Sequence, residues 1–404
     1  MLLLWVVLLA PLWGLAGESG DTQAETVSAQ TSLEAEKKKY IYKVLVERET
    51  PFLKIGWGGR VLVDTPLNSE PEGAHVVLRS GQVNFSRRFK QDWFVKATLD
   101  YNNAGKFELS DNYVSYSGWH TGIVKFGVFD PPFSLESVSS TTGLTFMERA
   151  LPVVALAERK SGGVGLLKRT SSSILSAGLF FLSPEAEGLS DSGKALVLHY
   201  VHSPITFLGR ENVHVGGSFS YRNNTDDVQF RSRPEVATAD DYFVDTGVLG
   251  SADRVVRAGF EASKVFGRQS WQSEVLLTRI TVKQSSNATF WGAYFFYSWF
   301  LTNDSRNYDD GRGEFIPVVP NSPLFKGGKG AFELAVRASY VDLTDNDIIG
   351  GEESNVSVGL NWYLNEQFRV MTNLVKVFDV KRPGSEYDGV DPLIFSLRLQ
   401  WHLN

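Results

Sequence analysis

The chain has 404 residues, a net charge of −6 and no cysteine, and 43% of its residues are hydrophobic. The missing cysteines exclude disulfides, thiol chemistry and cysteine-ligated metals, and the acidic balance argues against a nucleic-acid partner. Aromatic residues make up 13% of the chain, a high share that membrane β-barrels place in girdles at the two membrane interfaces.

The chain begins with an uncharged apolar run, residues 1–16, which ends in the small-x-small pattern of Gly14 and Ala16. This pattern predicts a secretory signal peptide, although no basic residue precedes the apolar run. Residues 17–50 form a polar N-terminal extension, in which 32–39 contains helix-forming residues. We interpret this extension as a solvated tail or a short coiled-coil helix.

From residue 51 to residue 404 the hydrophobic pattern has a period of two. The segment 354–364 shows this best, because apolar residues alternate with small or polar ones. The apolar residues all occupy even-numbered positions: Val356, Val358, Leu360, Trp362 and Leu364. Side chains on a strand point alternately to opposite faces, so such a segment has one apolar face and one polar face. Recurrence of this pattern over the whole segment predicts an all-β protein, a transmembrane antiparallel β-barrel.

Seventeen segments between 51 and 403 fit the pattern. Single-chain bacterial barrels normally have an even number of strands, so we expect sixteen, with 229–233 lying partly in a loop. Tight turns are expected at 267–269 and 365–367, and long loops at 130–161 and 302–328. We expect the turns at one end of the barrel and the long loops at the other. A soluble β-sandwich is the alternative fold, but it does not account for so many aromatic residues.

Several stretches resemble the phosphate-selective porin O and P family. They are VKFGVFDPPFSLE at 124–136, TFMERALP at 145–152, GGKGAFELAVRASY at 327–340 and GLNWYLN at 359–365. The resemblance implies a sixteen-stranded homotrimeric channel in the bacterial outer membrane that passes small anions such as phosphate or polyphosphate and contacts outer-membrane lipid. It also implies that the long loop 130–161 folds into the barrel and narrows it.

An anion channel needs cationic groups that replace part of the hydration of the ion. Strand parity places several basic residues on the polar face, and these are the candidate pore-lining residues: Lys54, Arg60, Lys96, Lys125, Arg222, Arg231, Arg233, Arg337 and Arg398. Arg231 and Arg233 share parity and are expected to form a two-step ladder. Arg79 fits no clean parity and is placed on neither face.

Each of these residues has an alternative interpretation as an ordinary charge on a wet wall, paired with an acid as in Glu333–Arg337. By resemblance, Glu148 and Arg149 belong to the constriction loop, where Arg149 either narrows the pore or pins the loop by pairing with Glu148 or Glu136. Lys326 and Lys329 are candidates for the pore mouth.

Acidic candidates for the pore wall leave strict anion selectivity open; they are Asp64, Asp100, Glu261, Glu274 and Glu333. A general-diffusion or organic-solute porin is therefore an alternative, and a plugged structural or adhesive outer-membrane protein is another. The sequence contains no zincin helix motif, nucleophile elbow or phosphate-binding loop, so we expect no enzyme, metal or cofactor.

Overall fold

The computed structural model describes residues 55–67, 77–90, 92–102, 107–120, 122–182, 193–203, 211–236, 241–283 and 287–403. The predicted signal peptide, the N-terminal extension and Lys54 lie outside these residues. Within them, none of the helices is long and apolar enough to cross a membrane.

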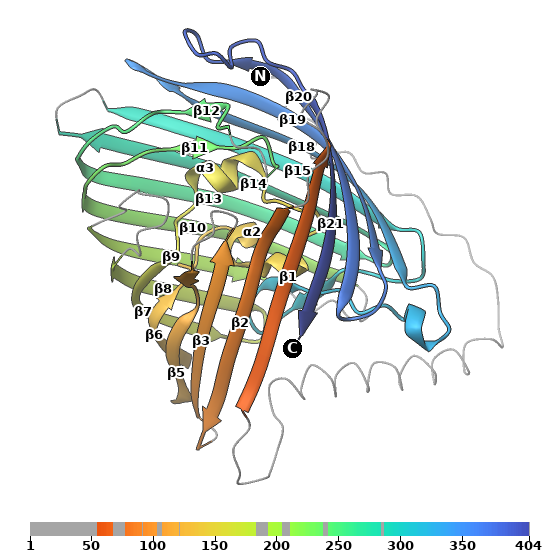
Figure 1. The fold of residues 1–404 in the computed structure, drawn as a ribbon. Coiled ribbons are helices and arrows are strands. Elements are labelled where there is room, and N and C mark those ends of the chain that lie inside the picture. Colours follow the sequence, from red (N-terminus) through yellow and green to blue (C-terminus); the bar gives the residue numbers. More distant parts are fainter. Residues whose placement is uncertain are drawn as a thin grey trace, which may run out of the picture. The chain divides into compact units, whose positions relative to one another are not determined.

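One antiparallel sheet dominates the fold and curves round on itself (Figure 1). Within the residues described, it contains seventeen strands. In chain order they are β1 (Ile55–Leu67), β2 (Val77–Phe89), β3 (Trp93–Asn102), β4 (Phe107–Leu109), β5 (Asn112–Trp119), β6 (Gly122–Phe129), β7 (Ser161–Arg169), β8 (Ser173–Leu182), β9 (Lys194–His202), β10 (Glu211–Thr225), β13 (Ala252–Phe266), β14 (Gln269–Val282), β15 (Ala288–Phe300), β18 (Ala331–Asp345), β19 (Ile348–Tyr363), β20 (Phe368–Lys381) and β21 (Leu393–Leu403).

The strands pair with their neighbours in chain order, and the first strand also pairs with the last. β1 is hydrogen-bonded to β2 on one side and to β21 on the other. The short strand β4 pairs with β3 beside β5. Without β4, the described pairings lead through sixteen of the seventeen strands and back to β1. Pairing on both sides satisfies the backbone groups that an open sheet edge would expose to lipid.

The expected loop at 229–233 is confirmed. Among the described strands, β11 (Arg231–Ser232) pairs with β12 (Val244–Asp245) alone, in a separate two-stranded sheet. The predicted arginine ladder is therefore not part of the barrel wall. Arg231 and Arg233 belong to the connection between β10 and β13 and not to a strand of the large sheet.

The two faces of the wall follow the predicted alternation. On β19, Val358 and Leu360 are 38% and 42% exposed, whereas Ser357 and Asn361 are fully buried. On β21, Leu399 is 54% exposed and Arg398 is 2% exposed. Exposed aliphatic and aromatic side chains therefore form the outer, lipid-facing surface, and the polar parity faces inward.

Tight turns connect strands at the end of the sheet where β21 terminates, which we call the C-terminal end. Gly267 adopts a positive φ of 60° in the two-residue connection between β13 and β14, a conformation that glycine reaches without strain. Asn365 closes the turn between β19 and β20 by accepting hydrogen bonds from the backbone N–H groups of Gln367 and Phe368. Both predicted turns are confirmed.

The predicted separation of short turns from long loops is wrong in one case. The connection 301–330 between β15 and β18 begins beside the turn at Arg268, whose carbonyl accepts a hydrogen bond from Phe300 N–H. Leu324 N–H likewise donates to the carbonyl of Leu364. This long connection thus shares the C-terminal end with the turns. Its hairpin, residues 307–316, packs against the loop 130–161, where Phe315 N–H donates to the Ser139 hydroxyl at 3.3 Å.

Three long connections pack against the inner face of the wall. The constriction loop, 130–160, contains α2 (Leu135–Val138), η2 (Thr141–Gly143) and α3 (Leu151–Leu156). The second inner loop, 226–251, contains β11 and β12. The third inner loop, 301–330, contains β16 (Asn307–Asp309), β17 (Glu314–Ile316) and η3 (Leu324–Lys326). Figure 1 shows α2 and α3 within the curve of the sheet.

An apolar core forms between the constriction loop and one side of the wall. Phe146 and Leu151 of the loop belong to the same buried cluster as Phe290 and Phe296 of β15. The rings of Phe146 and Phe296 meet edge to face, with centroids 5.6 Å apart. β15 is apolar on both faces, because its outer face meets lipid and its inner face meets the loop.

Neighbouring residues on β2 point to opposite faces of the wall, which allows the assignment of the outer and inner faces to be tested. Val83 is 48% exposed on the outer face, whereas Gln82 donates to Asp100 Oδ2 at 3.3 Å. We expect Val83→Arg to lower the free energy of unfolding by about 2–4 kcal/mol, because it places a cation in lipid. Gln82→Arg should cost little. Urea unfolding from lipid vesicles measures both, and equal losses would contradict the assignment of faces.

Candidate functional site

The constriction loop is anchored to the inner wall by carboxylates that meet buried arginines. Glu158 accepts from Arg222 and from Arg257 at 2.7 Å each, and also from the Ser220 hydroxyl. Arg222 is fully buried and Arg257 is 3% exposed. Burial opposes ionisation of Glu158, but the charges of Arg257 and Arg222 outweigh it and lower the pKa of Glu158.

Glu148 forms a second anchor against the seam between the first and last strands. It accepts from Arg398 at 2.5 Å and lies 3.5 Å from Arg79. Burial would raise the pKa of Glu148, but Arg79 and Arg398 outweigh it and lower the pKa from 4.5 to about 2. Glu148 is therefore ionised at neutral pH and neutralises part of the charge of two wall arginines.

Arg337 joins the constriction loop to the second inner loop. Its guanidinium lies 2.7 Å from the Glu235 carboxylate and 3.6 Å from the Glu136 carboxylate, and it donates to the Glu148 carbonyl at 3.0 Å. It also lies 4.3 Å from the centroid of the Phe146 ring. The predicted pair Glu333–Arg337 is wrong. Glu333 instead accepts from the Tyr363 hydroxyl at 2.7 Å.

Wall carboxylates hold the start of α2. Leu135 N–H donates to Glu261 at 2.7 Å, and Glu136 N–H donates to Glu274 at 2.8 Å. Glu261 also meets His199 and His214, at 2.6 and 2.9 Å. These two carboxylates were expected in the wall. In the structure they accept hydrogen bonds from the backbone N–H groups at the start of α2, which the helix itself leaves without partners.

Arg149 pins the constriction loop to itself. It donates to the main-chain carbonyls of Glu136, Ser137 and Ser139 at 3.0, 3.1 and 3.2 Å. Of the two roles considered for this residue, the geometry supports the pinning role. Its partners are carbonyls, however, and not the expected carboxylates of Glu148 or Glu136.

The inner wall has a covered side and an open side. Inward side chains on β10, β13–β15 and β18–β21 are mostly buried beneath the inner loops, including Arg222, Arg337 and Arg398. Inward side chains on β2–β6 are mostly part-exposed. The three arginines thus lie on the inner wall, as parity predicted, but as loop anchors. Water has access to the polar wall mainly on the side of β2–β6.

Three lysines gather on this open side, and we call Lys96, Lys125 and Lys160 the lysine cluster. Lys96 and Lys160 share one carboxylate, Asp111, at 2.8 and 2.5 Å, and Lys160 is also 3.3 Å from Asp130. Nearby charges raise the pKa of Lys160 although burial opposes protonation. Lys160 is therefore protonated at neutral pH.

Lys125 is the member without a carboxylate within 4 Å in the described part of the chain. Its ammonium group lies 4.4 Å from the centre of the Tyr113 ring and 4.9 Å from that of Phe129. Gly127 lets β5 approach β6 closely here, because a Cβ at this position would lie 2.2 Å from the Asn112 carbonyl oxygen. The close pairing holds Tyr113 beside the lysine.

The other predicted residues are placed as follows. Arg60 lies in β1, opposite Gln82 and His402 in the register of its two neighbours. Arg231 and Arg233 both stack on the Tyr242 ring, 4.0 and 4.4 Å from its centre, within the second inner loop. Lys326 and Lys329 are exposed on the third inner loop at the C-terminal end.

Sequence reasoning missed Arg79 because a β-bulge interrupts the alternation. Along β1 and β2, Leu62 pairs with Ser80 and Val63 pairs with Leu78, so Arg79 is the extra residue. Two further residues of the site were not predicted. Arg257 was missed because the charged residues Asp253 and Arg254 interrupt the alternation of apolar and polar residues on its strand. Lys160 was missed because it lies in the loop and not on a strand.

Comparison with known proteins agrees with this architecture. A family model described as phosphate-selective porin O and P matches residues 61–403. An uncharacterized protein of Caulobacter vibrioides is 29% identical over 309 residues, which cover 71% of this chain and 60% of that relative's length. Porin O of Pseudomonas aeruginosa is 24% identical over 350 residues, 77% of this chain and 78% of the relative.

The fold also matches solved structures. The anion-selective porin from Comamonas acidovorans has a TM-score of 0.56 and 11% identity, covering 87% of this chain and 99% of that one. The barrel and its inner loops define a porin of the bacterial outer membrane, a channel and not an enzyme. The chain belongs to the phosphate-selective porin O and P family, so the resemblance found in the sequence is confirmed.

Loop anchoring by Glu148 gives a second prediction. Glu148→Gln leaves Arg398 buried without its carboxylate, and we expect a loss of about 3–5 kcal/mol in the free energy of unfolding. The double variant with Arg398→Met removes both charges and should recover part of this loss. Urea unfolding measures the cycle. Strict additivity of the two single variants would contradict a direct interaction.

The low pKa of Glu148 gives a third prediction. A carboxyl whose pKa falls from 4.5 to about 2 on folding stabilises the protein above pH 4.5, and this contribution disappears as the pH falls towards 2. The stability difference between wild type and Glu148→Gln should stay constant from pH 7 to 5 and then shrink by about 3 kcal/mol. A difference that is the same at pH 3 and pH 7 would contradict the ion pair.

Proposed function

We propose that this porin is a passive channel for small anions, that phosphate or polyphosphate is its physiological class of solute, and that it works as a homotrimer. Membership of the family and the names of its relatives support this proposal. The observation that carries it is Lys125, an inward cation with no carboxylate within 4 Å in the described residues.

The covered side of the wall contributes little to selectivity in this proposal. Arg222, Arg337 and Arg398 face carboxylates at 2.5–2.7 Å and are at most 2% exposed. A solute can neither reach these guanidinium groups nor feel their full charge, because an ion pair has a weak external field. Discrimination between anions and cations then depends on the lysine cluster.

The lysine cluster suits transport because its binding of anions is moderate. Lysine presents a flexible point charge that follows a moving ion, whereas arginine presents a rigid fork that holds it. Asp111 shares two of the three lysines and offsets part of their charge. An anion is therefore attracted strongly enough to lose some hydration water and weakly enough to leave again.

The third inner loop brings further charges to this region. Arg312 lies 3.4 Å from Glu314 and 3.7 Å from Asp309, and its side chain is 56% exposed. Both partners are carboxylates, so this part of the lining is mixed in charge. The mixture favours a second candidate function on the same barrel, a general-diffusion or organic-solute porin with only a mild preference for anions.

Ion selectivity of the reconstituted protein tests the proposal. In planar bilayers we expect chloride to permeate better than potassium, and phosphate to block the chloride current. Lys125→Gln should reduce the chloride-to-potassium permeability ratio roughly three- to ten-fold, because it removes a unit charge beside the ion path.

Arg279→Gln is the matched control, since Arg279 is exposed on the outer face of β14 and the substitution removes the same charge. This control should leave the ratio unchanged. A cation-selective wild-type current would overturn the proposed function. An anion-selective current without phosphate block would favour the general-diffusion porin.

A further inference from the structure

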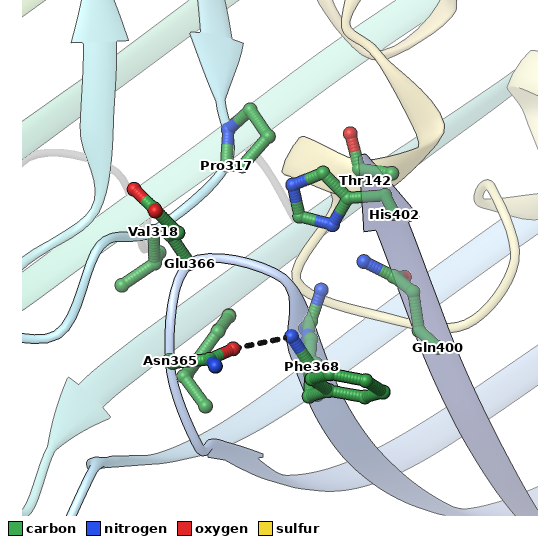
Figure 2. Close-up of a pocket in the computed structure, with 10 residues that line it drawn as sticks. Thr142, Pro317, Val318, Asn365, Glu366, Phe368, Gln400 and His402 are labelled. Carbon is green, nitrogen blue, oxygen red and sulfur yellow. Dashed lines mark hydrogen bonds between the residues drawn. The ribbon is translucent and has the colours of Figure 1, made fainter. Parts of the chain in front are cut away.

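A small pocket lies at the C-terminal end, between the constriction loop and the third inner loop. It is lined by Thr142 of η2, by Pro317 and Val318, by the turn after β19, and by residues of β20 and β21. In Figure 2, Thr142, Gln400 and His402 lie on one side of the pocket, and Val318, Asn365 and Glu366 lie on the other. The lining joins four segments that are distant in sequence.

Arg369 of β20 lines this pocket and is a buried cation without a counter-charge. It is 4% exposed. Its terminal nitrogens donate to the carbonyls of Leu144 and Thr145 at 2.7 and 2.9 Å, and its Nε has no hydrogen-bond partner. The Tyr363 ring lies 4.5 Å away. Arg369 has no carboxylate within 4 Å in the described residues.

The contrast with the other buried wall arginines is sharp. Arg222, Arg257, Arg337 and Arg398 each meet a loop carboxylate, the usual way in which a buried arginine is neutralised. A buried guanidinium that has only carbonyl partners and one unpaired N–H keeps a charge that the protein does not balance. An anion bound in the pocket would supply the balancing charge.

The remaining polar groups of the pocket are suited to an anion. Gln400 and His402 share the inner face of β21 with Arg398, and they are 3% and 7% exposed. An amide, an imidazole and the Thr142 hydroxyl can all donate hydrogen bonds. Glu366 is the exception, because its carboxylate is on the exposed turn and repels a second negative charge. The lining therefore favours a singly charged ion.

We infer that this pocket is an anion site, separate from the lysine cluster, that holds a halide or one oxygen of singly charged phosphate against Arg369. The inference deepens the proposed anion channel and rests on it for its physiological meaning. With the lysine cluster, it gives the channel two anion sites in series. Multi-site occupancy lets one ion assist the departure of the next.

Crystals of the full chain soaked in sodium bromide test the site directly, because bromide is located by its anomalous scattering. We expect a bromide peak at the Arg369 guanidinium, and none in Arg369→Met. The matched control is Arg279→Met, which removes the same charge from the exposed outer face of β14, away from the pocket lining. The control should retain the peak. Bromide at the lysine cluster with an empty pocket would overturn the inference.

A channel measurement gives an independent readout. Phosphate added on the side of the C-terminal end should block the wild-type current, and Arg369→Met should weaken this block roughly ten-fold, the worth of one charge-assisted hydrogen bond. Gln400→Leu, which leaves the loop carbonyls paired, should weaken it in the same direction. An unchanged block in both variants would overturn the site.

The two proposals fail in different ways. A cation-selective wild-type current overturns the proposed function and leaves the bromide result standing as a property of the pocket. An anion-selective current together with an empty pocket overturns only the second anion site.

Discussion

The pairing of buried inner-wall arginines with loop carboxylates is the interaction on which the rest of the structure depends. An arginine inside a protein is costly unless a carboxylate meets it, and the same holds for the carboxylate. Glu148, Glu158 and Glu235 each meet an arginine of a different part of the wall. These contacts fix the inner loops in position, and the position of the loops decides which wall residues water and solutes can reach.

As a consequence, different strands of the same ring support the fold and line the accessible part of the interior. The strands β10, β13–β15 and β18–β21 carry most of the apolar core and most of the anchoring pairs, and they act as a scaffold. The strands β2–β6 keep partly exposed polar side chains, among them two members of the lysine cluster. Fold stability and solute discrimination thus depend on different residues, although all of them face the same interior.

Much of the wall could be predicted from the sequence, because alternation along a strand depends on local residue order. The parity of 354–364 correctly placed Ser357 and Asn361 inside and Val358 and Leu360 outside. Parity failed at Arg79, where a bulge adds one residue. It also could not show that Arg337 is covered, since its partner Glu235 lies about a hundred residues earlier and meets it only after the loops fold inward.

The pairing of β1 with β21 also sets an order of assembly. The ring cannot be completed until the last strand is present, because its seam joins the two ends of the barrel sequence. Most of the strands that hold the constriction loop, from β10 to β20, precede β21 in the chain, whereas the Glu148–Arg398 contact needs β21 itself. The interior can therefore be packed while the sheet is still open beside β1, and closure then seals loops that are already in place instead of threading them through a finished cylinder.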